Sequence, residues 1–299
     1  MFLPEGLELD YLIDDLRILS WQAADILLYY SNQLRNEKAK RDFIKTKDNN
    51  EPVTLADLEV NELIINGIRE RYQKIEWQLL SEENGIIKLN NEDINTNWLW
   101  VLDPLDGTRD FLQKTKDYAL HLALNYRNKP QLGFVLIPAR GELWISNSKN
   151  TWCENRGGLK TKTKLSDRRE IYTMKLVTSK NHKNLTLKNI IQKIGFKESI
   201  SMGSVGCKIA SILRGESDIY ISLSLSGQSS PKDWDFAAPE ALLRSAGGII
   251  TNIDNEELKY NNLNFDQKGL IIASNDKDNH MNICKQIKFL LKENNIRIT

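Results

Sequence analysis

The sequence places two aspartates and a Gly-Thr pair in one short segment, D-P-L-D-G-T (residues 103–108), directly after the apolar run 98–102. The proline disfavours helix at the residue before it, so Asp103 is expected to lie extended at the end of a strand. The Asp-Gly pair that follows is a strong turn signal. A helix after this turn would aim the N–H groups of Gly107 and Thr108 outward as a cradle for an anion. An ordinary capped turn is the alternative, but the whole segment favours a site that holds a hard cation beside a phosphate.

Three other segments carry carboxylates that each have an ordinary structural explanation when taken alone. They are P-V-T-L-A-D (residues 52–57), S-E-E-N (residues 81–84) and W-D-F-A-A-P-E (residues 234–240). Thr54 and Asp57 have the spacing of a helix capping box. Asp235 suits the N-cap of a helix, with Pro239 near its first turn. These interpretations are compatible with function, because a helix start can also present its carboxylate to a site.

The elements that must position these residues follow from apolar periodicity and turn signals. Helices are expected over residues 12–30, from 54 onward, over 185–194, 205–213 and 236–246, and from about 281. Strands are expected over residues 78–80, 98–102, 119–126, 131–137, 142–146, 175–178, 219–223, 249–252 and 270–274. Three consecutive strands suit an antiparallel meander in an N-terminal α+β half (residues 1–158). Alternating strands and helices predict a smaller C-terminal α/β half (residues 159–299).

Composition excludes several kinds of protein and of metal site. The 299 residues include only three cysteines, without a C-x-x-C pair, and three histidines. A metal site would therefore use oxygen ligands rather than the ligands that zinc prefers. The 41 basic and 40 acidic residues nearly cancel, which argues against a nucleic-acid-binding polycation. No run approaches the ~20 apolar residues of a membrane span, and the acidic N-terminus is unlike a signal peptide. Reduced thiols suit the cytoplasm.

The four acidic segments, in this order, resemble the inositol monophosphatase superfamily of metal-dependent phosphomonoesterases. That family shows P-V-T-x-A-D, E-E, D-P-[LI]-D-G-T and W-D-x-A-A pieces, the last closed by A-G-G, and this chain has A-G-G at residues 246–248. The resemblance covers residues 52–248. It implies an αβαβα layered sandwich, a mixed α/β (α+β) fold with an antiparallel N-terminal sheet. It also implies two or three Mg²⁺ ions, and inhibition by Li⁺ is expected by family analogy.

The resemblance also implies the metal ligands. Glu82 and Asp103 would hold the activating ion, together with the carbonyl of Leu105. Asp103 would bridge to a second ion held by Asp106 and Asp235. Two such ions can neutralise both ends of an in-line displacement at a phosphate.

The catalytic roles follow from the same resemblance. Asp57, Thr108 and Glu82 would form the catalytic set. Thr108, hydrogen-bonded to Asp57, would orient and deprotonate the metal-activated water. The N–H groups of Gly107 and Thr108 would hold the phosphate, and Glu83 would lie behind the metal ligands.

Two further segments narrow the resemblance to the nucleotidases that act on 3′-phosphoadenosine 5′-phosphate. They are T-S-K-N-H (residues 178–182) and G-S-V-G-C-K-I (residues 203–209). The resemblance implies nucleotide contacts by Ser179, His182, Ser204 and Lys208, with Lys208 paired to the 5′-phosphate. Ser204 departs from the family, which often has glycine there. Taken alone, His182 is an ordinary loop histidine and Lys208 a solvated charge, whereas His121 is expected to be structural.

The leading interpretation is a Mg²⁺-dependent 3′(2′),5′-bisphosphate nucleotidase, which would convert 3′-phosphoadenosine 5′-phosphate, a by-product of sulfate assimilation, to AMP and phosphate. Its partner would be a small phosphorylated nucleotide, with no nucleic acid and no membrane span, and the protein would be a monomer or homodimer. An inositol monophosphatase or related sugar-phosphate phosphatase is the enzyme alternative. A catalytically silent phosphonucleotide-binding protein is the alternative of another class.

Overall fold

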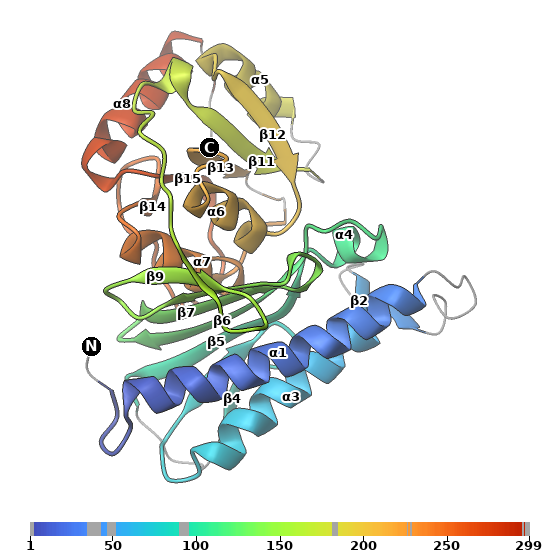
Figure 1. Cartoon of the computed structure of the whole chain (residues 1–299). Helices are drawn as coiled ribbons and strands as arrows, with labels where there is room; N and C mark the ends of the chain where they lie inside the picture. Colours follow the sequence, from blue (N-terminus) through green and yellow to red (C-terminus); the bar gives the residue numbers. More distant parts are fainter. Residues whose placement is uncertain are drawn as a thin grey trace.

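The computed structural model describes residues 3–34, 43–46, 52–89, 96–180, 185–225, 227, 229–294 and 296. Two large sheets and the helices around them form five layers (Figure 1). The first sheet has eight strands in the order β10-β9-β8-β7-β6-β5-β3-β4. Their bounds are β3 (Gln78–Ser81), β4 (Gly85–Lys88), β5 (Trp98–Asp106), β6 (Ala119–Tyr126), β7 (Lys129–Ile137), β8 (Glu142–Ser146), β9 (Thr151–Glu154) and β10 (Lys160–Lys162).

Neighbouring strands in this sheet are antiparallel except β3 and β5, which run parallel. The predicted meander of three strands is confirmed as β6, β7 and β8. The apolar start of β5 is buried, as expected of a central strand with both faces covered.

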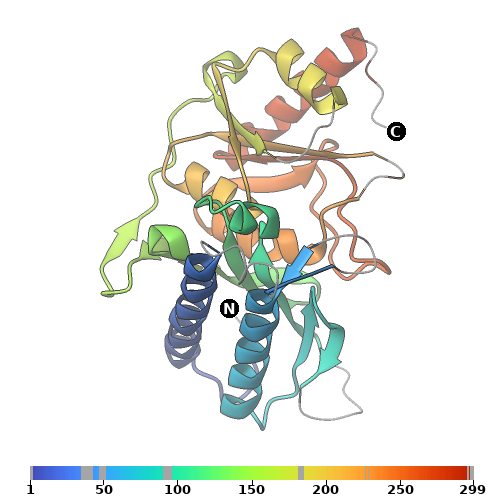
Figure 2. The same cartoon turned by 90° about the vertical axis from the view of Figure 1, so that its right-hand side faces the viewer.

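Two long helices, α1 (Leu9–Gln33) and α3 (Leu55–Arg71), lie side by side on one face of the eight-stranded sheet (Figures 1 and 2). Their apolar stripes form one core with the side chains of that face. Gly67 of α3 permits the close approach, since a Cβ atom there would overlap the side chain of Leu19. The opposite face packs against α6 (Val205–Leu213) and α7 (Asp233–Ser245) in a second core.

The second sheet has five strands in the order β12-β11-β13-β15-β14. Their bounds are β11 (Lys175–Ser179), β12 (Glu198–Met202), β13 (Ile219–Ser224), β14 (Ile249–Asn252) and β15 (Gly269–Ser274). Strand β11 is parallel to β12 and β13, whereas β15 is antiparallel to both its neighbours. Helices α5 (Leu185–Ile194) and α8 (Lys277–Glu293) cover the outer face through a third core. The αβαβα sandwich is thus confirmed.

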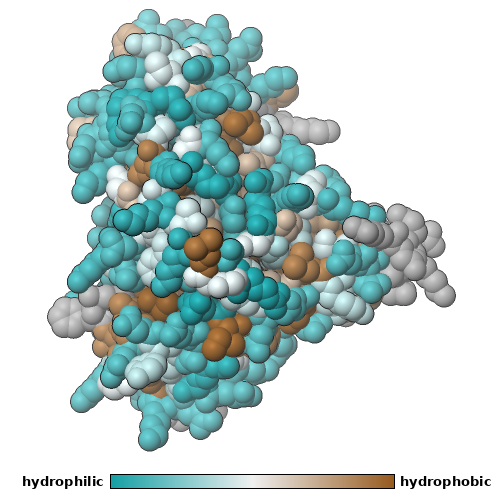
Figure 3. All heavy atoms as spheres, viewed as in Figure 1, coloured by the Kyte–Doolittle hydropathy of each residue, from teal (hydrophilic) through white to brown (hydrophobic). Residues whose placement is uncertain are grey.

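The remaining described elements are short. They are β1 (Ile44–Thr46), β2 (Pro52–Thr54), α4 (Thr108–Leu112), and the 3₁₀ turns η1 (Pro138–Arg140) and η2 (Ile171–Thr173). No described helix is long and apolar enough to cross a bilayer. The face in Figure 3 is mostly hydrophilic, with apolar side chains scattered over it.

Some predicted boundaries are wrong. Helix α7 begins at Asp233 with Lys232 as its N-cap, so Asp235 is the third helical residue rather than the N-cap, and Pro239 lies within the helix. The reason is that the Lys232 N–H donates to the Asp235 carboxylate at 2.6 Å, which closes the first turn earlier than expected. Helix α8 likewise begins at Lys277, one turn before the prediction, because Asp276 caps it.

Several short strands have no counterpart in the prediction: β1, β2, β4, β9, β10 and β12. In β10 all three residues are exposed, and most of β12 is exposed, so apolar alternation could not reveal them. Strand β10 lies beyond residue 158 yet pairs with β9 in the first sheet, and α7 packs on that same sheet. The division of the chain at residue 158 stays a prediction.

Candidate metal centre and active site

Three carboxylates converge where the carboxyl end of β5 meets the first turn of α7. Asp103, Asp106 and Asp235 each offer one oxygen, and these oxygens all lie within 4.8 Å of one another. Asp103 is buried, and the other two are partly exposed. More than a hundred residues of chain separate β5 from α7, so the layered packing brings this set together.

A bulge in β5 lets both of its aspartates reach the same place. Residues three apart in a regular strand point to opposite faces. Here Asp103 pairs with His121 and Asp106 pairs with Ala119, so β5 holds one residue more than β6 between these two pairs. Such an insertion re-aims the side chains that follow it. The Leu105 N–H also donates to Asp103 Oδ1 at 3.0 Å, which orients that carboxylate.

The carboxylate of Asp106 is held by the start of α6. Ser204 Oγ donates to Asp106 Oδ2 at 2.7 Å, and the N–H of Val205 donates to the same oxygen. Ser204 also caps α6 by accepting from the Cys207 N–H. Its backbone has φ +49°, a region that favours glycine. The serine that departs from the family pattern therefore keeps a glycine-like backbone and contributes its hydroxyl to a predicted metal ligand.

His121 also lies against the carboxylate of Asp106. The sequence predicts only a structural role for this histidine. Its Nε2 lies 3.3 Å from Asp106 Oδ2 and accepts the Gly206 N–H at 3.1 Å. The proton is therefore on Nδ1, which contacts the Trp234 carbonyl at 3.4 Å. Burial lowers the pKa of His121, although Asp106 opposes this, so the ring is neutral. No sequence signal marks His121, because its role depends on its register opposite β5.

Asp57 and Thr108 form the pair that the sequence predicts. The predicted capping box is confirmed: Thr54 N–H and Oγ1 donate to Asp57 Oδ2 at 2.8 and 2.6 Å, and Thr54 caps α3. Thr108 Oγ1 lies 3.4 Å from Asp57 Oδ1 and 3.1 Å from the Leu105 carbonyl oxygen. Burial raises the pKa of Asp57 to about 7, against the lowering effect of the Thr54 hydrogen bonds. Asp57 is thus poised to exchange a proton near neutral pH.

Glu82 reaches this edge from β3. Because β3 and β5 are parallel, their carboxyl ends meet, and the Glu82 N–H donates to the Leu102 carbonyl at 3.1 Å. Its negative charge helps to raise the pKa of both Asp103 and Asp57. Glu82 is outside the tight group of three carboxylates and lies at its margin.

The group of carboxylates is electrostatically unfavourable by itself. Burial, followed by the charges of Glu82 and Asp106, raises the pKa of Asp103 well above its ordinary value. Burial, followed by the charge of Asp106, does the same to the pKa of Asp235. Like charges held together in a desolvated place need a compensating cation. An all-oxygen donor set fits a hard divalent ion such as Mg²⁺.

The turn between β5 and α4 requires its glycine. Gly107 has φ +89°, and a Cβ atom there would lie 2.9 Å from the Asp117 carbonyl oxygen. It is the N-cap residue of α4, so the predicted turn followed by a helix is confirmed. The backbone of Gly107 and Thr108 thus lies directly beside the carboxylates.

Lys208 is buried rather than solvated. Its Nζ donates to the Ser204 carbonyl at 3.0 Å and lies 5.3 Å from the centre of the Tyr220 ring. Burial lowers its pKa, whereas Asp106 and Asp235 raise it. Ser179, at the end of β11, shares a side-chain hydrogen bond with Tyr220. Lys208 and Ser179 therefore both contact Tyr220, and Lys208 also binds the Ser204 carbonyl; no sequence pattern indicated the part of Tyr220.

His182, the fourth predicted nucleotide residue, lies outside the described residues. Just before it, Lys180 Nζ lies 3.2 Å from Asp110 Oδ1. Asp110 is buried in α4 against Gly203, where a Cβ atom would overlap its carboxylate. This ion pair joins the end of β11 to the turn that carries Gly107, and no motif in the sequence predicts it.

Comparisons with known proteins agree with the motifs. Residues 10–292 match the inositol monophosphatase family. The 3′(2′),5′-bisphosphate nucleotidase CysQ of Buchnera aphidicola subsp. Acyrthosiphon pisum is 31% identical over 219 residues, which cover 73% of this chain and 77% of that protein. Nus factor SuhB of Escherichia coli K12 is 27% identical over 234 residues, or 77% and 80% of the two chains. The IMPase of Thermotoga maritima has the same fold, with a TM-score of 0.72 at 20% identity over 95% of this chain and 99% of that one. With a match that spans nearly its whole length, the chain belongs to the inositol monophosphatase family.

Proposed function

We propose that this protein is a Mg²⁺-dependent phosphomonoesterase that hydrolyses 3′-phosphoadenosine 5′-phosphate to AMP and phosphate. The observation that carries the proposal is the convergence of Asp103, Asp106 and Asp235 beside the Asp57–Thr108 pair. The choice of substrate is supported by relatives named 3′(2′),5′-bisphosphate nucleotidase CysQ, which are 27–31% identical. In a cell that assimilates sulfate, this reaction would remove a by-product.

Five groups would hold the metal: the carboxylates of Glu82, Asp103, Asp106 and Asp235 and the carbonyl of Leu105. When bound, Mg²⁺ supplies positive charge that offsets the phosphate oxygens and makes water a better nucleophile. The raised pKa values of Asp103 and Asp235 support this assignment, because they mark negative charge that the protein leaves uncompensated.

The residues of the chain itself move the proton. Thr108 Oγ1 accepts a proton from the attacking water as it passes its own to Asp57 Oδ1, 3.4 Å away. A threonine is a poor base alone, but Asp57 has a pKa of about 7 and can take the proton near neutral pH. The N–H groups of Gly107 and Thr108 orient the phosphate.

The nucleotide would lie towards β11 and α6. Ser204, Lys208, Ser179 and His182 would contact it, with Lys208 supplying positive charge for the second phosphate. Support comes from the position of Lys208, which is held between the Ser204 carbonyl and the Tyr220 ring next to the carboxylates.

Hydrolysis of inositol monophosphate or a sugar phosphate is the second candidate function. It is favoured by the solved structures of the same fold, among them the inositol monophosphatase of Anabaena, with a TM-score of 0.70. Another of them is SaIMPase-II with 2′AMP bound, so the fold alone does not separate the two substrates. A catalytically silent binding protein is the alternative of another class, and release of phosphate would exclude it.

A substrate panel tests the proposal. The purified chain is assayed with Mg²⁺ for phosphate release from 3′-phosphoadenosine 5′-phosphate, inositol 1-phosphate and fructose 1,6-bisphosphate. We expect the highest kcat/KM with the first. Asp103→Asn removes one of the converging charges and serves as the inactive variant, and Asp10→Asn on the exposed face of α1 is its matched control. Preference for either of the other two substrates would exclude the nucleotidase, and no release from any would favour the binding protein.

A further inference from the structure

The turn between β3 and β4 carries Glu82, one of the proposed metal ligands. Ser81 of β3 pairs with Gly85 of β4, so residues 82–84 form a loop of three residues between the two strands. Gly85 has φ +67°, the left-handed conformation that commonly closes a hairpin loop of this length. The Glu82 N–H donates to the Leu102 carbonyl of β5 at 3.1 Å. The sheet therefore fixes the start of the loop.

Asn61 of α3 holds both ends of this loop. Its Oδ1 accepts the Ser81 hydroxyl at 2.5 Å, and its Nδ2 donates to Asn84 Oδ1 at 2.6 Å. Ser81 Oγ in turn accepts the Glu83 N–H at 3.2 Å, within the loop. One side-chain amide thus joins the residue before Glu82 and the residue that ends the loop. We call Asn61, Ser81 and Asn84 the loop clamp.

The clamp begins in the protein interior. Asn61 is 2% exposed, and Ser81 is fully buried. A buried amide or hydroxyl that loses its partner is costly, so these two groups hold each other in place. The position also requires an amide, because an aspartate could not donate to Asn84 and an apolar side chain could bond neither end of the loop. The contacts of Asn61 are therefore specific to the acidic loop.

Asn61 lies one helical turn after Asp57 in α3. Residues four apart lie on the same face of a helix, so one face of α3 presents Asp57 to Thr108 and Asn61 to the loop. The charge of Glu82 is among the causes that raise the pKa of Asp57 and Asp103, so the loop brings Glu82 within electrostatic reach of both. The position of Glu82 against the converging carboxylates therefore depends on how α3 holds the loop.

We propose that Asn61 is a positioning residue for the metal centre: through Ser81 and Asn84 it sets where Glu82 lies, and thereby the affinity for Mg²⁺. Asn61 itself contacts neither the metal nor the substrate. The inference rests on the proposed function, because it takes Glu82 as a metal ligand. Replacing a residue that orients a metal ligand commonly costs about ten- to hundredfold in metal affinity.

Calorimetric titration of the full chain with Mg²⁺, without substrate, tests this role. Asn61→Ala removes both bonds of the amide and should weaken Mg²⁺ binding about tenfold or more. Asn275→Ala is its matched control, because Asn275 is also buried and its amide donates to the Ser166 carbonyl at 3.1 Å rather than to the acidic loop. It should leave Mg²⁺ affinity within about twofold. Circular dichroism checks that each variant is folded.

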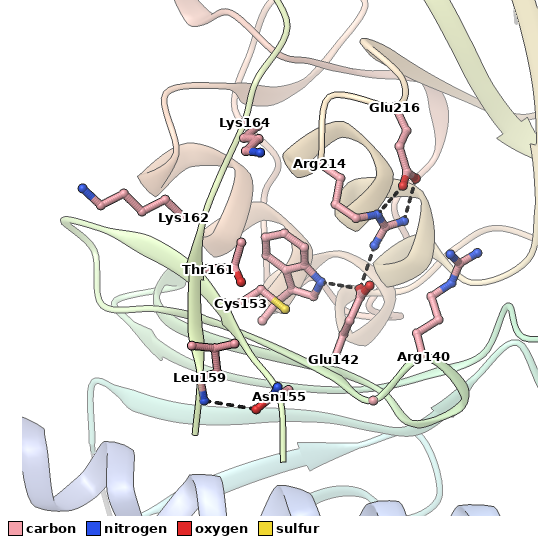
Figure 4. A pocket seen from close by; sticks show the side chains of 12 residues that line it. Arg140, Glu142, Cys153, Asn155, Leu159, Thr161, Lys162, Lys164, Arg214 and Glu216 are labelled. Atoms are coloured by element: carbon pink, nitrogen blue, oxygen red, sulfur yellow. Dashed lines mark hydrogen bonds and ion pairs between the residues drawn. The ribbon is translucent and has the colours of Figure 1, made fainter. Parts of the chain in front are cut away.

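Asn84→Ala is a second variant that leaves the core intact, because Asn84 is exposed. It should weaken Mg²⁺ binding by a smaller factor than Asn61→Ala, since Ser81 keeps its bond to Asn61, and it should add little in the Asn61→Ala background. Asn155→Ala is its matched control. Asn155 is likewise exposed, and its Oδ1 accepts the Leu159 N–H at 3.0 Å in the turn between β9 and β10 (Figure 4). This variant should bind Mg²⁺ as wild type does.

The outcomes separate the positioning role from the metal centre itself. Wild-type Mg²⁺ affinity in Asn61→Ala would overturn the role, and so would an equal loss in Asn275→Ala, which would indicate general destabilisation. If Asn61→Ala does not fold, wild-type affinity in Asn84→Ala overturns the role instead. Failure of wild type to bind Mg²⁺ would overturn the metal centre and the role together. Because no substrate is present, the titration does not depend on which phosphate ester the protein hydrolyses.

Discussion

Replacing Asp57 by asparagine should stabilise the metal-free protein, and the gain should depend on pH. Asp57 is buried at the start of α3, and burial raises its pKa from an ordinary 3.8 to about 7. The folded chain thus holds the Asp57 proton more tightly than the unfolded chain does. For a carboxyl group with a raised pKa, stability falls as the pH rises from about 4 to about 7 and is level above that. A neutral asparagine at this position would carry no such penalty.

The pKa values and the cap set the size of the effect. At about 1.4 kcal/mol for each pH unit, the full penalty on wild type is about 4 kcal/mol, of which about 3 kcal/mol accumulates between pH 5 and pH 8. Asparagine weakens the hydrogen bonds from Thr54, which costs about 1 kcal/mol at every pH. The advantage of Asp57→Asn over wild type should therefore grow by about 3 kcal/mol between pH 5 and pH 8.

Urea unfolding in EDTA at pH 5, 6, 7 and 8 measures this directly, through the midpoint at constant slope. Asp10→Asn, on an exposed position of α1, should follow wild type throughout. An Asp57→Asn advantage that is the same at all four pH values, or that shrinks as the pH rises, would refute the reasoning.

The same variant should lose about a hundredfold or more in kcat, because it cannot take the proton from Thr108.

Four further predictions concern the site and its support. Asp103→Asn should abolish turnover, and measurable wild-type-like rates would contradict the assignment of this carboxylate to a metal. Addition of Mg²⁺ should raise the thermal unfolding temperature of wild type, and less so that of Asp103→Asn, since only the folded state presents the converging carboxylates. Gly206→Ala should lower the free energy of unfolding by about 2 kcal/mol, because the added methyl overlaps His121; a neutral result in urea would show that His121 can move away. Turnover should fall in millimolar Li⁺ by family analogy, and unchanged turnover would count against it.

Much of the local structure could be predicted from neighbouring residues alone. The capping box of Thr54 and Asp57, the Asp106–Gly107 turn and the helix at 205–213 depend on contacts within a few residues, so propensity and spacing suffice. The core strands 119–126 and 249–252 were also found with the bounds that the structure has, because runs of apolar residues of strand length are a strong signal.

The elements that were missed or misplaced depend on backbone pairing and capping that the residue types do not mark. The edge strand β10 has no apolar face and exists only because β9 offers it backbone partners. The start of α7 was misplaced because Asp235, rather than capping from outside, accepts the N–H of Lys232 from within the first turn. The start of α7 cannot be read from the residue types, since acidic residues are common both as N-caps and within the first turn of a helix.

The sequence by itself determined which residues are candidates for the chemistry: the order of the acidic segments, the scarcity of cysteine and histidine and the resemblance they support are independent of the fold's details. The tertiary structure alone decided how these residues meet. A bulge in β5 turns Asp103 and Asp106 to one side, β6 brings His121 against Asp106, and α6 buries Lys208 behind them. The physical reason is that strand register and layer packing set burial and proximity, and burial in turn sets the pKa values on which the site depends.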